Sequence, residues 1–284
     1  MNVIIWGCGQ GGRTVKNWLP ADARLLAFAD SDPALQHTFR ENVPVIPPEE
    51  IPRHQPDLVW IAVRNREASS QIRQRLEAMG FSGDIRSLTE FCDSMDLRRA
   101  CLRMLAQEIR SRKLPGEMAE LGVYQGEFAR EMNRLLPEKK LYLFDTFKGF
   151  PEEDTCMERQ RHPGQKSPMT FQDTSLELVR SRLPYPEQAV FCPGRFPDSL
   201  AALQDPLPAL ALVSLDPDLY EPVRQGLKIF WPLLVPGGMI LIHDYNNSQF
   251  PGAGDAVREF CREHRLTVLP LPDLHGSGVL VKQE

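Results

Sequence analysis

Short apolar runs alternate with amphipathic segments along most of the chain, an order typical of α/β proteins. The clearest example starts with the apolar run 118–123, continues through an amphipathic segment, and ends with a second apolar run, 141–144, that stops at Asp145. Gly122 and Gly126 bracket the turn after the first run. This pattern predicts a βαβ unit, and a ligand crevice is expected at the carboxyl ends of its two strands.

The sequence after this unit predicts the remainder of one sheet. Five further strands are indicated by apolar runs at residues 188–193, 209–215, 239–242, 266–271 and 278–282. The last two runs are joined by the turn-rich sequence PDLHGS, which predicts a hairpin. A parallel sheet that ends in such a hairpin is not expected for a Rossmann dehydrogenase.

A smaller α/β pattern occupies the first part of the chain. An apolar strand, 2–6, leads directly into Gly7, Gly9 and Gly12, which satisfy the G-x-G-x-x-G fingerprint, and Asp30 ends the next predicted strand. This setting is the one that the Rossmann fingerprint requires. Its length of about 80 residues suffices for three or four strands but not for two mononucleotide-binding halves. We expect it either to bind a nucleotide or nucleotide-linked sugar at the three glycines or to serve as a scaffold or dimer surface.

The predicted elements divide the chain into three parts. We expect a Rossmann-like domain at residues 1–83, a helical connector at 84–115 and a second domain at 116–284, because Pro115 and Gly116 end a helical pattern just before the βαβ unit. The expected fold class is α/β, with a seven-stranded Rossmann-like sheet preceded by a smaller Rossmann-like domain.

The composition is that of an ordinary globular protein. Of 284 residues, 42% are hydrophobic and 25% are charged, and the formal net charge is −5, which argues against nucleic acid or an anionic membrane as the main partner. No apolar run approaches the roughly 18 residues of a membrane span, and no basic region precedes the first strand, so the expected location is the cytoplasm. The six cysteines form no C-x-x-C pair, which fits reduced thiols rather than a zinc or disulfide framework.

The residues around the predicted βαβ crevice favour S-adenosylmethionine (SAM) as its ligand. The spacing G-x-x-x-G does not match the dinucleotide fingerprint, and Glu120 at the tip of the first strand would repel phosphate but can hold an ammonium group. Asp145 suits a pair of ribose hydroxyls. SAM carries an amino group, a sulfonium and a ribose but no phosphate. The alternative is a nucleotide crevice of another kind.

The segments ELGVYQGEFA and LYLFDTFKGFPEED are similar to the first two motifs of class I methyltransferases, and they resemble the macrocin O-methyltransferase family. The resemblance implies that SAM binds with its ribose on Asp145. It further implies cofactor contacts at Glu120, Gly122, Tyr124 and Gly126 around the methionine end, and at Gly194, Arg195 and Phe196 toward the adenine. The first domain resembles the small Rossmann-like domain of sugar-nucleotide acetyltransferases and of some sugar-modifying methyltransferases.

Two acidic residues, Asp216 and Asp244, end neighbouring predicted strands. Carboxylates and amides gathered at one edge of a sheet favour a hard cation such as Mg²⁺. The catechol and macrocin O-methyltransferase families have such an arrangement, and the resemblance assigns Asp216 and Asp244 to the metal, with His243 or Asn246 as the third ligand. Imidazole also suits Mn²⁺, Fe²⁺ or Zn²⁺. The alternatives are that Asp218 only caps a helix and that His243 is a core histidine.

The polar, proline-containing segment 151–186 has no periodic apolar face except near its end, where residues 175–183 are compatible with a helix. A segment of this length without regular structure is usually a lid or a disordered loop. We therefore expect either a lid above the ligand site or a solvated surface loop. His162 within it is treated as incidental.

Together these features predict a SAM-dependent, metal-assisted O-methyltransferase that acts on a hydroxyl of a sugar or glycosylated natural product. Asp218, His243 or Asp216 would take the proton from the acceptor, and the sequence does not rank them. Two other classes remain open: a non-catalytic regulatory protein that binds SAM and a nucleotide, and an NAD-dependent sugar oxidoreductase. The oligomeric state is left open, a homo-oligomer included.

Overall fold

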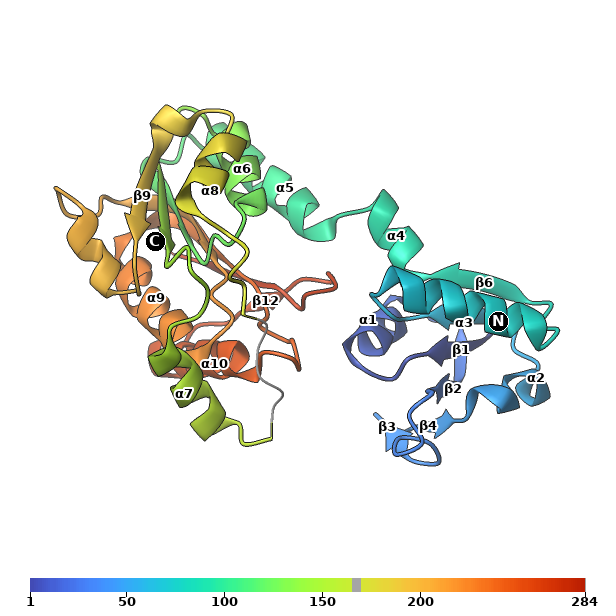
Figure 1. Cartoon of the computed structure of the whole chain (residues 1–284). Coiled ribbons are helices and arrows are strands. Elements are labelled where there is room, and N and C mark those ends of the chain that lie inside the picture. Colours follow the sequence, from blue (N-terminus) through green and yellow to red (C-terminus); the bar gives the residue numbers. More distant parts are fainter. Residues whose placement is uncertain (165–169, 284) are drawn as a thin grey trace. The chain divides into compact units, whose positions relative to one another are not determined.

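A computed structural model describes residues 1–164 and 170–283 (Figure 1). The chain forms two compact units. The N-terminal unit comprises Met1–Asp96 with Pro272–Leu274, and the C-terminal unit comprises Leu97–Leu271 with the chain from His275 onward.

The division between the units falls between two helices, α4 (Leu88–Ser94) and α5 (Leu97–Ser111). The expected connector, 84–115, is therefore not a separate part of the chain. Leu88 is buried in the core of the N-terminal unit, whereas the apolar side of α5 is buried in the core of the C-terminal unit.

The N-terminal unit contains a six-stranded sheet in the order β3-β4-β2-β1-β5-β6. Its strands are β1 (Asn2–Trp6), β2 (Arg24–Ala29), β3 (Phe39–Arg40), β4 (Val43–Ile46), β5 (Leu58–Ile61) and β6 (Asp84–Ser87). Neighbouring strands are parallel except β3 and β4. The sheet has more strands than the three or four predicted, and β6 lies beyond the expected boundary at residue 83.

Side chains of β1 alternate between the two faces of this sheet. Val3 and Ile5 share a core with α1 (Gln10–Trp18) and α4, whereas Ile4 and Trp6 share a core with α2 (Ile51–His54) and α3 (Arg66–Ala78). A short 3-10 helix, Pro48–Glu50, precedes α2. Because helices cover both faces, the central strand is apolar throughout.

The C-terminal unit contains a seven-stranded sheet in the order β12-β13-β11-β10-β7-β8-β9. Its strands are β7 (Glu117–Leu121), β8 (Leu141–Asp145), β9 (Ala189–Pro193), β10 (Leu210–Leu215), β11 (Leu234–Ile242), β12 (Leu269–Pro270) and β13 (Gly278–Val281). β13 is antiparallel to both of its neighbours, and the other neighbouring pairs are parallel. The predicted fold class is confirmed, including the closing hairpin.

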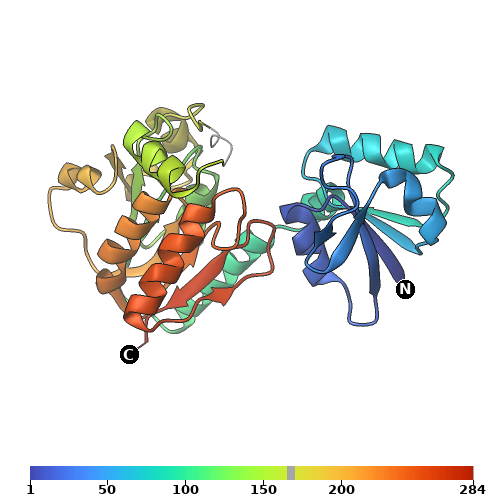
Figure 2. The same ribbon diagram turned by 90° about the horizontal axis from the view of Figure 1, so that it is seen from below.

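Helices cover both faces of the seven-stranded sheet. On one face the core is shared with α5, α6 (Glu127–Leu135) and α8 (Leu176–Arg182), and on the other with α9 (Tyr220–Leu233) and α10 (Pro251–His264). Figure 2 shows α9 and α10, in orange and red, lying side by side. Two 3-10 helices, Pro186–Gln188 and Asp198–Ala202, complete the unit.

The polar segment 151–186 does not lack regular structure, contrary to the prediction, because α7 (Glu152–Arg161) forms within it. The buried carboxylate of Glu158 accepts the backbone N–H of Tyr220 at 2.9 Å and that of Gly252 at 3.1 Å. These N–H groups belong to the first turns of α9 and α10. N–H groups in the first turn of a helix have no partner within that helix. Polar contacts therefore hold α7 against α9 and α10. For this reason its sequence has no apolar periodicity from which the helix could be predicted. Residues 165–169 of the predicted lid lie outside the described residues.

We expect Glu158→Ala to lower the free energy of unfolding by about 2–4 kcal/mol, because two buried N–H groups lose a charged acceptor. Urea denaturation followed by circular dichroism would measure the change. Glu152→Ala is the matched control in the same helix, where the side chain is 82% exposed and the expected change is below about 1 kcal/mol. Equal effects of the two substitutions would contradict a specific role for Glu158.

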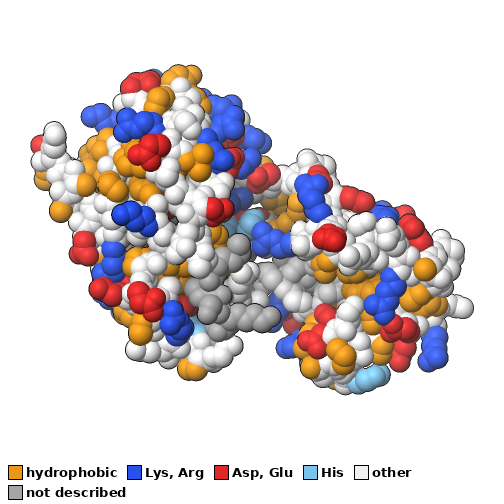
Figure 3. Space-filling view, viewed as in Figure 1, with side chains coloured by type: hydrophobic (Ala, Val, Ile, Leu, Met, Phe, Trp, Pro, Cys, Tyr) orange, Lys and Arg blue, Asp and Glu red, His pale blue; other side chains and the backbone are white. Residues whose placement is uncertain are grey.

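The surface carries charges of both signs. Figure 3 shows Lys and Arg side chains interspersed with Asp and Glu on the visible face. Two ion pairs, Arg99–Glu127 and Arg103–Glu131, link α5 to α6, and Arg110 pairs with Glu138 in the turn after α6. Exposed pairs of this kind each contribute little to stability. Among the residues that the structure describes, no helix combines the length and apolar character needed to cross a membrane.

Candidate functional site

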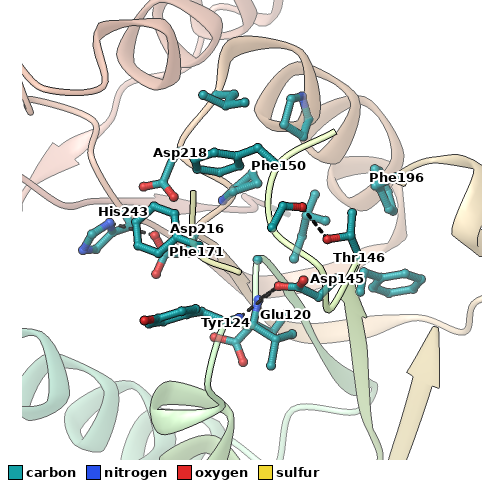
Figure 4. A pocket seen from close by; sticks show the side chains of 18 of the residues that line it. Glu120, Tyr124, Asp145, Thr146, Phe150, Phe171, Phe196, Asp216, Asp218 and His243 are labelled. Atoms are coloured by element: carbon teal, nitrogen blue, oxygen red, sulfur yellow. Dashed lines mark hydrogen bonds and ion pairs between the residues drawn. The ribbon is translucent and has the colours of Figure 1, made fainter. Parts of the chain in front are cut away.

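A cavity of about 330 Å³ opens in the C-terminal unit, where β7, β8, β10 and β11 end (Figure 4). Its wall includes Glu120 and Gly122 at the end of β7, Asp145 at the end of β8, Asp216 after β10 and His243 after β11. The carboxyl ends of parallel strands meet at one edge of a sheet, which is why these residues converge.

The carboxylate of Asp145 holds the glycine turn that follows β7. Its Oδ2 accepts the backbone N–H groups of Val123 at 2.7 Å and Tyr124 at 2.9 Å. Gly122 in this turn has φ of +84°, and a Cβ at this position would lie 2.1 Å from the carbonyl oxygen of Asp216. Only glycine fits there. The backbone of the turn after β7 therefore lies close to the backbone that follows β10.

The carboxylate of Glu120 is buried at the cavity wall, with the residue 1% exposed. Oε1 accepts a hydrogen bond of 3.3 Å from Ser214 Oγ, and Oε2 has no hydrogen-bond partner among residues 1–164 and 170–283. Burial raises the pKa of Glu120 well above its usual range, although the charge of Arg98 opposes this shift. A buried oxygen without a partner is costly, and it suits a ligand that supplies a hydrogen-bond donor.

Four side chains after β10 and β11 form what we call the acid–imidazole cluster: Asp216, Asp218, His243 and Asp244. Each offers one ligand atom, and these atoms lie within 4.8 Å of one another. His243 Nδ1 lies 2.7 Å from Asp216 Oδ1 and 2.9 Å from Asp244 Oδ2, but neither contact has hydrogen-bond geometry. Asp218 and Asp244 have φ of +60° and +57°, a strained conformation that is concentrated at functional sites.

The charges of the cluster act strongly on one another. Burial alone would lower the pKa of His243, but Asp216 and Asp244 outweigh it and raise the pKa to about 9. Burial raises the pKa of Asp218 well above its usual range, and Asp244 and Asp216 beside it raise it further. Arg98 and His243 instead lower the pKa of Asp216 in spite of its burial. The cluster is therefore a place where negative charge is crowded and positive charge is favoured.

The donors of the acid–imidazole cluster fit a divalent cation. Three carboxylates and one imidazole converge, and within the described part of the chain Asp244 Oδ2 and His243 Nδ1 have no hydrogen-bond partner. Oxygen donors suit Mg²⁺ or Mn²⁺, and the imidazole is also compatible with Fe²⁺ or Zn²⁺. The structure adds Asp218 to the possible ligands. Asn246, the alternative third ligand, has an exposed side chain, and its backbone N–H binds the carbonyl of Gly276.

Two of the three residues expected to contact adenine line the cavity, and the third does not. Gly194 and Phe196 line the cavity, and the ring of Phe196 packs edge-on against Phe144 with centroids 5.4 Å apart. Arg195 is not among the lining residues, because its guanidinium binds Asp154 of α7 at 2.7 Å. Gly126, at the N-cap of α6, is not among them either.

Three aromatic residues form a wall of the cavity: Tyr124, Phe150 and Phe171. The ring of Phe171 packs edge-to-face against Tyr124, at 5.1 Å, and against Phe150, at 5.2 Å. The Tyr124 hydroxyl donates to Asp173 Oδ1 at 2.8 Å, so the segment after residue 170 helps to hold the wall. Phe150 and Phe171 were not predicted as site residues.

Arg98 and His275 are two further cavity residues that the sequence did not predict. The Arg98 guanidinium binds Asp216 Oδ2 at 2.9 Å and lies 4.0 Å from the centre of the Phe128 ring. The ring of His275 packs against His243, with centroids 4.5 Å apart. The sequence feature that could have pointed to Arg98 is its charge beside the apolar residues of its helix. No motif or residue spacing in the sequence pointed to His275.

Similarity to known proteins assigns the chain to a family. A sequence model described as Macrocin-O-methyltransferase (TylF) matches residues 61–283, most of the chain. The chain belongs to the macrocin-O-methyltransferase family. This membership confirms the resemblance carried by residues 120–129 and 141–154. A second model, described as C2185-like, N-terminal, matches residues 1–85, and the likeness of this part to acetyltransferase domains stays a prediction.

Among curated proteins, this macrocin-O-methyltransferase family member is similar to two named enzymes. One is 8-demethyl-8-(2,3-dimethoxy-alpha-L-rhamnosyl)-tetracenomycin-C 4'-O-methyltransferase of Streptomyces olivaceus, 29% identical over 58% of this chain and 65% of that protein. The other is mycinamicin III 3''-O-methyltransferase of Micromonospora griseorubida, 28% identical over 54% of this chain and 63% of that protein. The chain thus spans less than two thirds of the length of these relatives.

Solved structures of methyltransferases share the fold. The O-methyltransferase NovP has a TM-score of 0.53 and 23% identity, covering 66% of this chain and 80% of its own. CalS11, a calicheamicin methyltransferase, has a TM-score of 0.52 and 19% identity, covering 76% of this chain and 86% of its own. At these identities the likeness shows the fold alone, which is that of class I methyltransferases.

Proposed function

We propose that this protein transfers the methyl group of SAM to a hydroxyl of a sugar-containing small molecule, with a divalent cation bound beside the donor. The observation that carries the proposal is that Glu120, Asp145, Asp216 and His243 line one cavity. An acid suited to ribose and an acid suited to ammonium therefore adjoin a group of metal-type donors. Membership of the macrocin-O-methyltransferase family supports the same activity.

The part of the cavity near the glycine turn would bind the donor. Asp145 retains one acceptor position for a ribose hydroxyl, on Oδ1, because its carboxylate accepts the N–H groups of Val123 and Tyr124 on Oδ2 and that of Phe147 on Oδ1. Glu120 would accept the donor's ammonium group, and the apolar surface of Phe196 suits the adenine. Gly126 and Arg195 would act indirectly, through the turn and through α7, rather than by touching the cofactor.

The acid–imidazole cluster would bind the cation and the reacting hydroxyl. Once bound, the cation would lower the pKa of the acceptor hydroxyl, and SAM would supply the electrophilic methyl group. The protein's own residues hold the hydroxyl in place and accept its proton. Of the three candidate bases, Asp216 already binds Arg98, which leaves Asp218 and His243 as the groups that could accept the proton.

The proposed acceptor class follows from the relatives and from the cavity. The two relatives are named for methylation of a tetracenomycin that carries a rhamnosyl group and of mycinamicin III. The aromatic wall of Tyr124, Phe150 and Phe171 offers a flat apolar surface beside the acid–imidazole cluster. Such a surface can pack against the apolar face of a sugar ring or against an aglycone.

The test is methyl transfer from labelled SAM to a panel of glycosylated acceptors, with Mg²⁺ and after treatment with EDTA. We expect turnover that falls at least about tenfold on chelation and returns when Mg²⁺ or Mn²⁺ is added. Turnover that is unaffected by EDTA would remove the cation from the proposal. Tight SAM binding without turnover of any acceptor would favour a regulatory protein instead, and NAD-dependent oxidation of a sugar would favour an oxidoreductase.

We also propose that the N-terminal unit binds a nucleotide or nucleotide-linked sugar at Gly7, Gly9 and Gly12. A Cβ at Gly9 would meet no atom within 4 Å, which leaves room for a phosphate at the N-terminus of α1. Asp30 directly follows β2, and it accepts the Cys8 backbone N–H at 3.1 Å. Thermal-shift titration with UDP-sugars and NAD would test this, since a scaffold or dimer surface predicts no shift.

A further inference from the structure

Arg98 is a charged residue of the cavity to which the proposed reaction gives no role. Its side chain is 13% exposed and lies against the ring of Phe128. One guanidinium nitrogen binds Asp216 Oδ2 at 2.9 Å, and Nε is buried without a hydrogen-bond partner in the part of the chain that the structure describes. A guanidinium has five N–H donors in a fixed plane, so this one has donors left for a second acceptor.

Glu120 supplies a hydrogen-bond acceptor in the same cavity. Its Oε2 is buried and has no hydrogen-bond partner among the described residues. The cavity thus combines a guanidinium and a carboxyl group that each have unused hydrogen-bonding capacity, and both are withdrawn from water. The head group of an amino acid carries a carboxylate and an ammonium on one carbon, and it satisfies both side chains at once.

We propose that Arg98 binds the α-carboxylate of the methyl donor while Glu120 binds its ammonium, and that the guanidinium releases Asp216 as it does so. This inference rests on the proposed function and adds a residue to it. Arg98 neutralises Asp216 in the donor-free protein, and the released Asp216 is then available to the acid–imidazole cluster. Binding of the donor and binding of a cation therefore favour each other.

The test compares two ligands by isothermal titration calorimetry: S-adenosylhomocysteine and its analogue without the α-carboxylate, 5′-deoxy-5′-(3-aminopropylthio)adenosine. In the wild-type protein the analogue should bind about tenfold or more weakly, because it lacks the charge-assisted bonds to Arg98. Arg98→Met should weaken S-adenosylhomocysteine about tenfold or more but change the affinity of the analogue less than about twofold. Glu120→Gln should weaken both ligands, since both carry the ammonium.

Arg99→Met is the matched control, because Arg99 follows on the same helix, pairs with Glu127 at 3.4 Å and is not among the cavity residues. It should leave both affinities unchanged. Equal binding of the two ligands by the wild-type protein, or equal weakening of both by Arg98→Met, would overturn the proposal. If Arg98→Met does not fold, the wild-type comparison and Arg98→Lys decide in the same way. Failure of the wild-type protein to bind either ligand would refute the SAM site itself.

Discussion

Asp216→Asn should lower the rate of methyl transfer at least about 1000-fold while leaving the affinity for S-adenosylhomocysteine unchanged or higher. Asparagine keeps the shape of the side chain but removes a charge from the cluster that would hold the cation and receive the acceptor. It also removes the ion pair with Arg98. The guanidinium is then free to bind the donor's carboxylate, so donor binding should not suffer. Turnover of labelled SAM and calorimetric titration measure the two effects separately.

Asp198→Asn is the matched control for this experiment. The substitution is the same and lies in the same unit, but the Asp198 side chain is 76% exposed and pairs only loosely with Arg195, at 3.7 Å. Turnover and donor affinity should both be unchanged. If Asp216→Asn weakened donor binding as strongly as it slowed turnover, Asp216 would belong to the donor site. Undiminished turnover would exclude it from catalysis.

The sequence predicts the strands that are apolar on both faces and fails for those that are not. β10 is buried along its whole length and can be read directly as a continuous apolar run. β3 has two residues, and β6 has the polar sequence DIRS, so both depend on pairing with a neighbouring strand rather than on their own pattern. α7 escaped prediction for a related reason, since the buried polar contacts of Glu158 hold it in place.

The same limit applies to the cavity. Glu120, Asp145 and Asp216 could be predicted because parallel strands bring their carboxyl ends to one edge, whatever the loops do. Arg98 and His275 come from the helix before the sheet and from the final hairpin connection, whose approach to the cavity depends on tertiary packing. Sequence adjacency can also mislead, because side chains of neighbouring residues diverge. Arg195 stands between two lining residues, yet its side chain binds α7.

The donor site can be tested at its other end. Asp145→Ala should weaken binding of S-adenosylhomocysteine at least about tenfold, because the carboxylate is expected to accept a ribose hydroxyl, and a hydrogen bond to a charged group contributes roughly 1.5–3 kcal/mol. The substitution also removes the acceptor for the N–H groups of Val123 and Tyr124, which loosens the turn. Calorimetric titration gives the affinity, and circular dichroism shows whether the fold is retained.

Asp30→Ala provides the control that decides between the two sheets. Asp145 ends the second strand of a glycine-containing βαβ pattern, and Asp30 directly follows the second strand of another. Each accepts a backbone N–H from the turn after the first strand of its pattern. Only Asp145 shares its cavity with an unpartnered buried carboxylate oxygen and a cation-type donor set, within the residues described. Asp30→Ala should therefore leave the affinity for S-adenosylhomocysteine within about twofold. If Asp30→Ala weakened S-adenosylhomocysteine binding and Asp145→Ala did not, the methyl donor would bind to the N-terminal unit. The cavity of the C-terminal unit would then lack its proposed ligand.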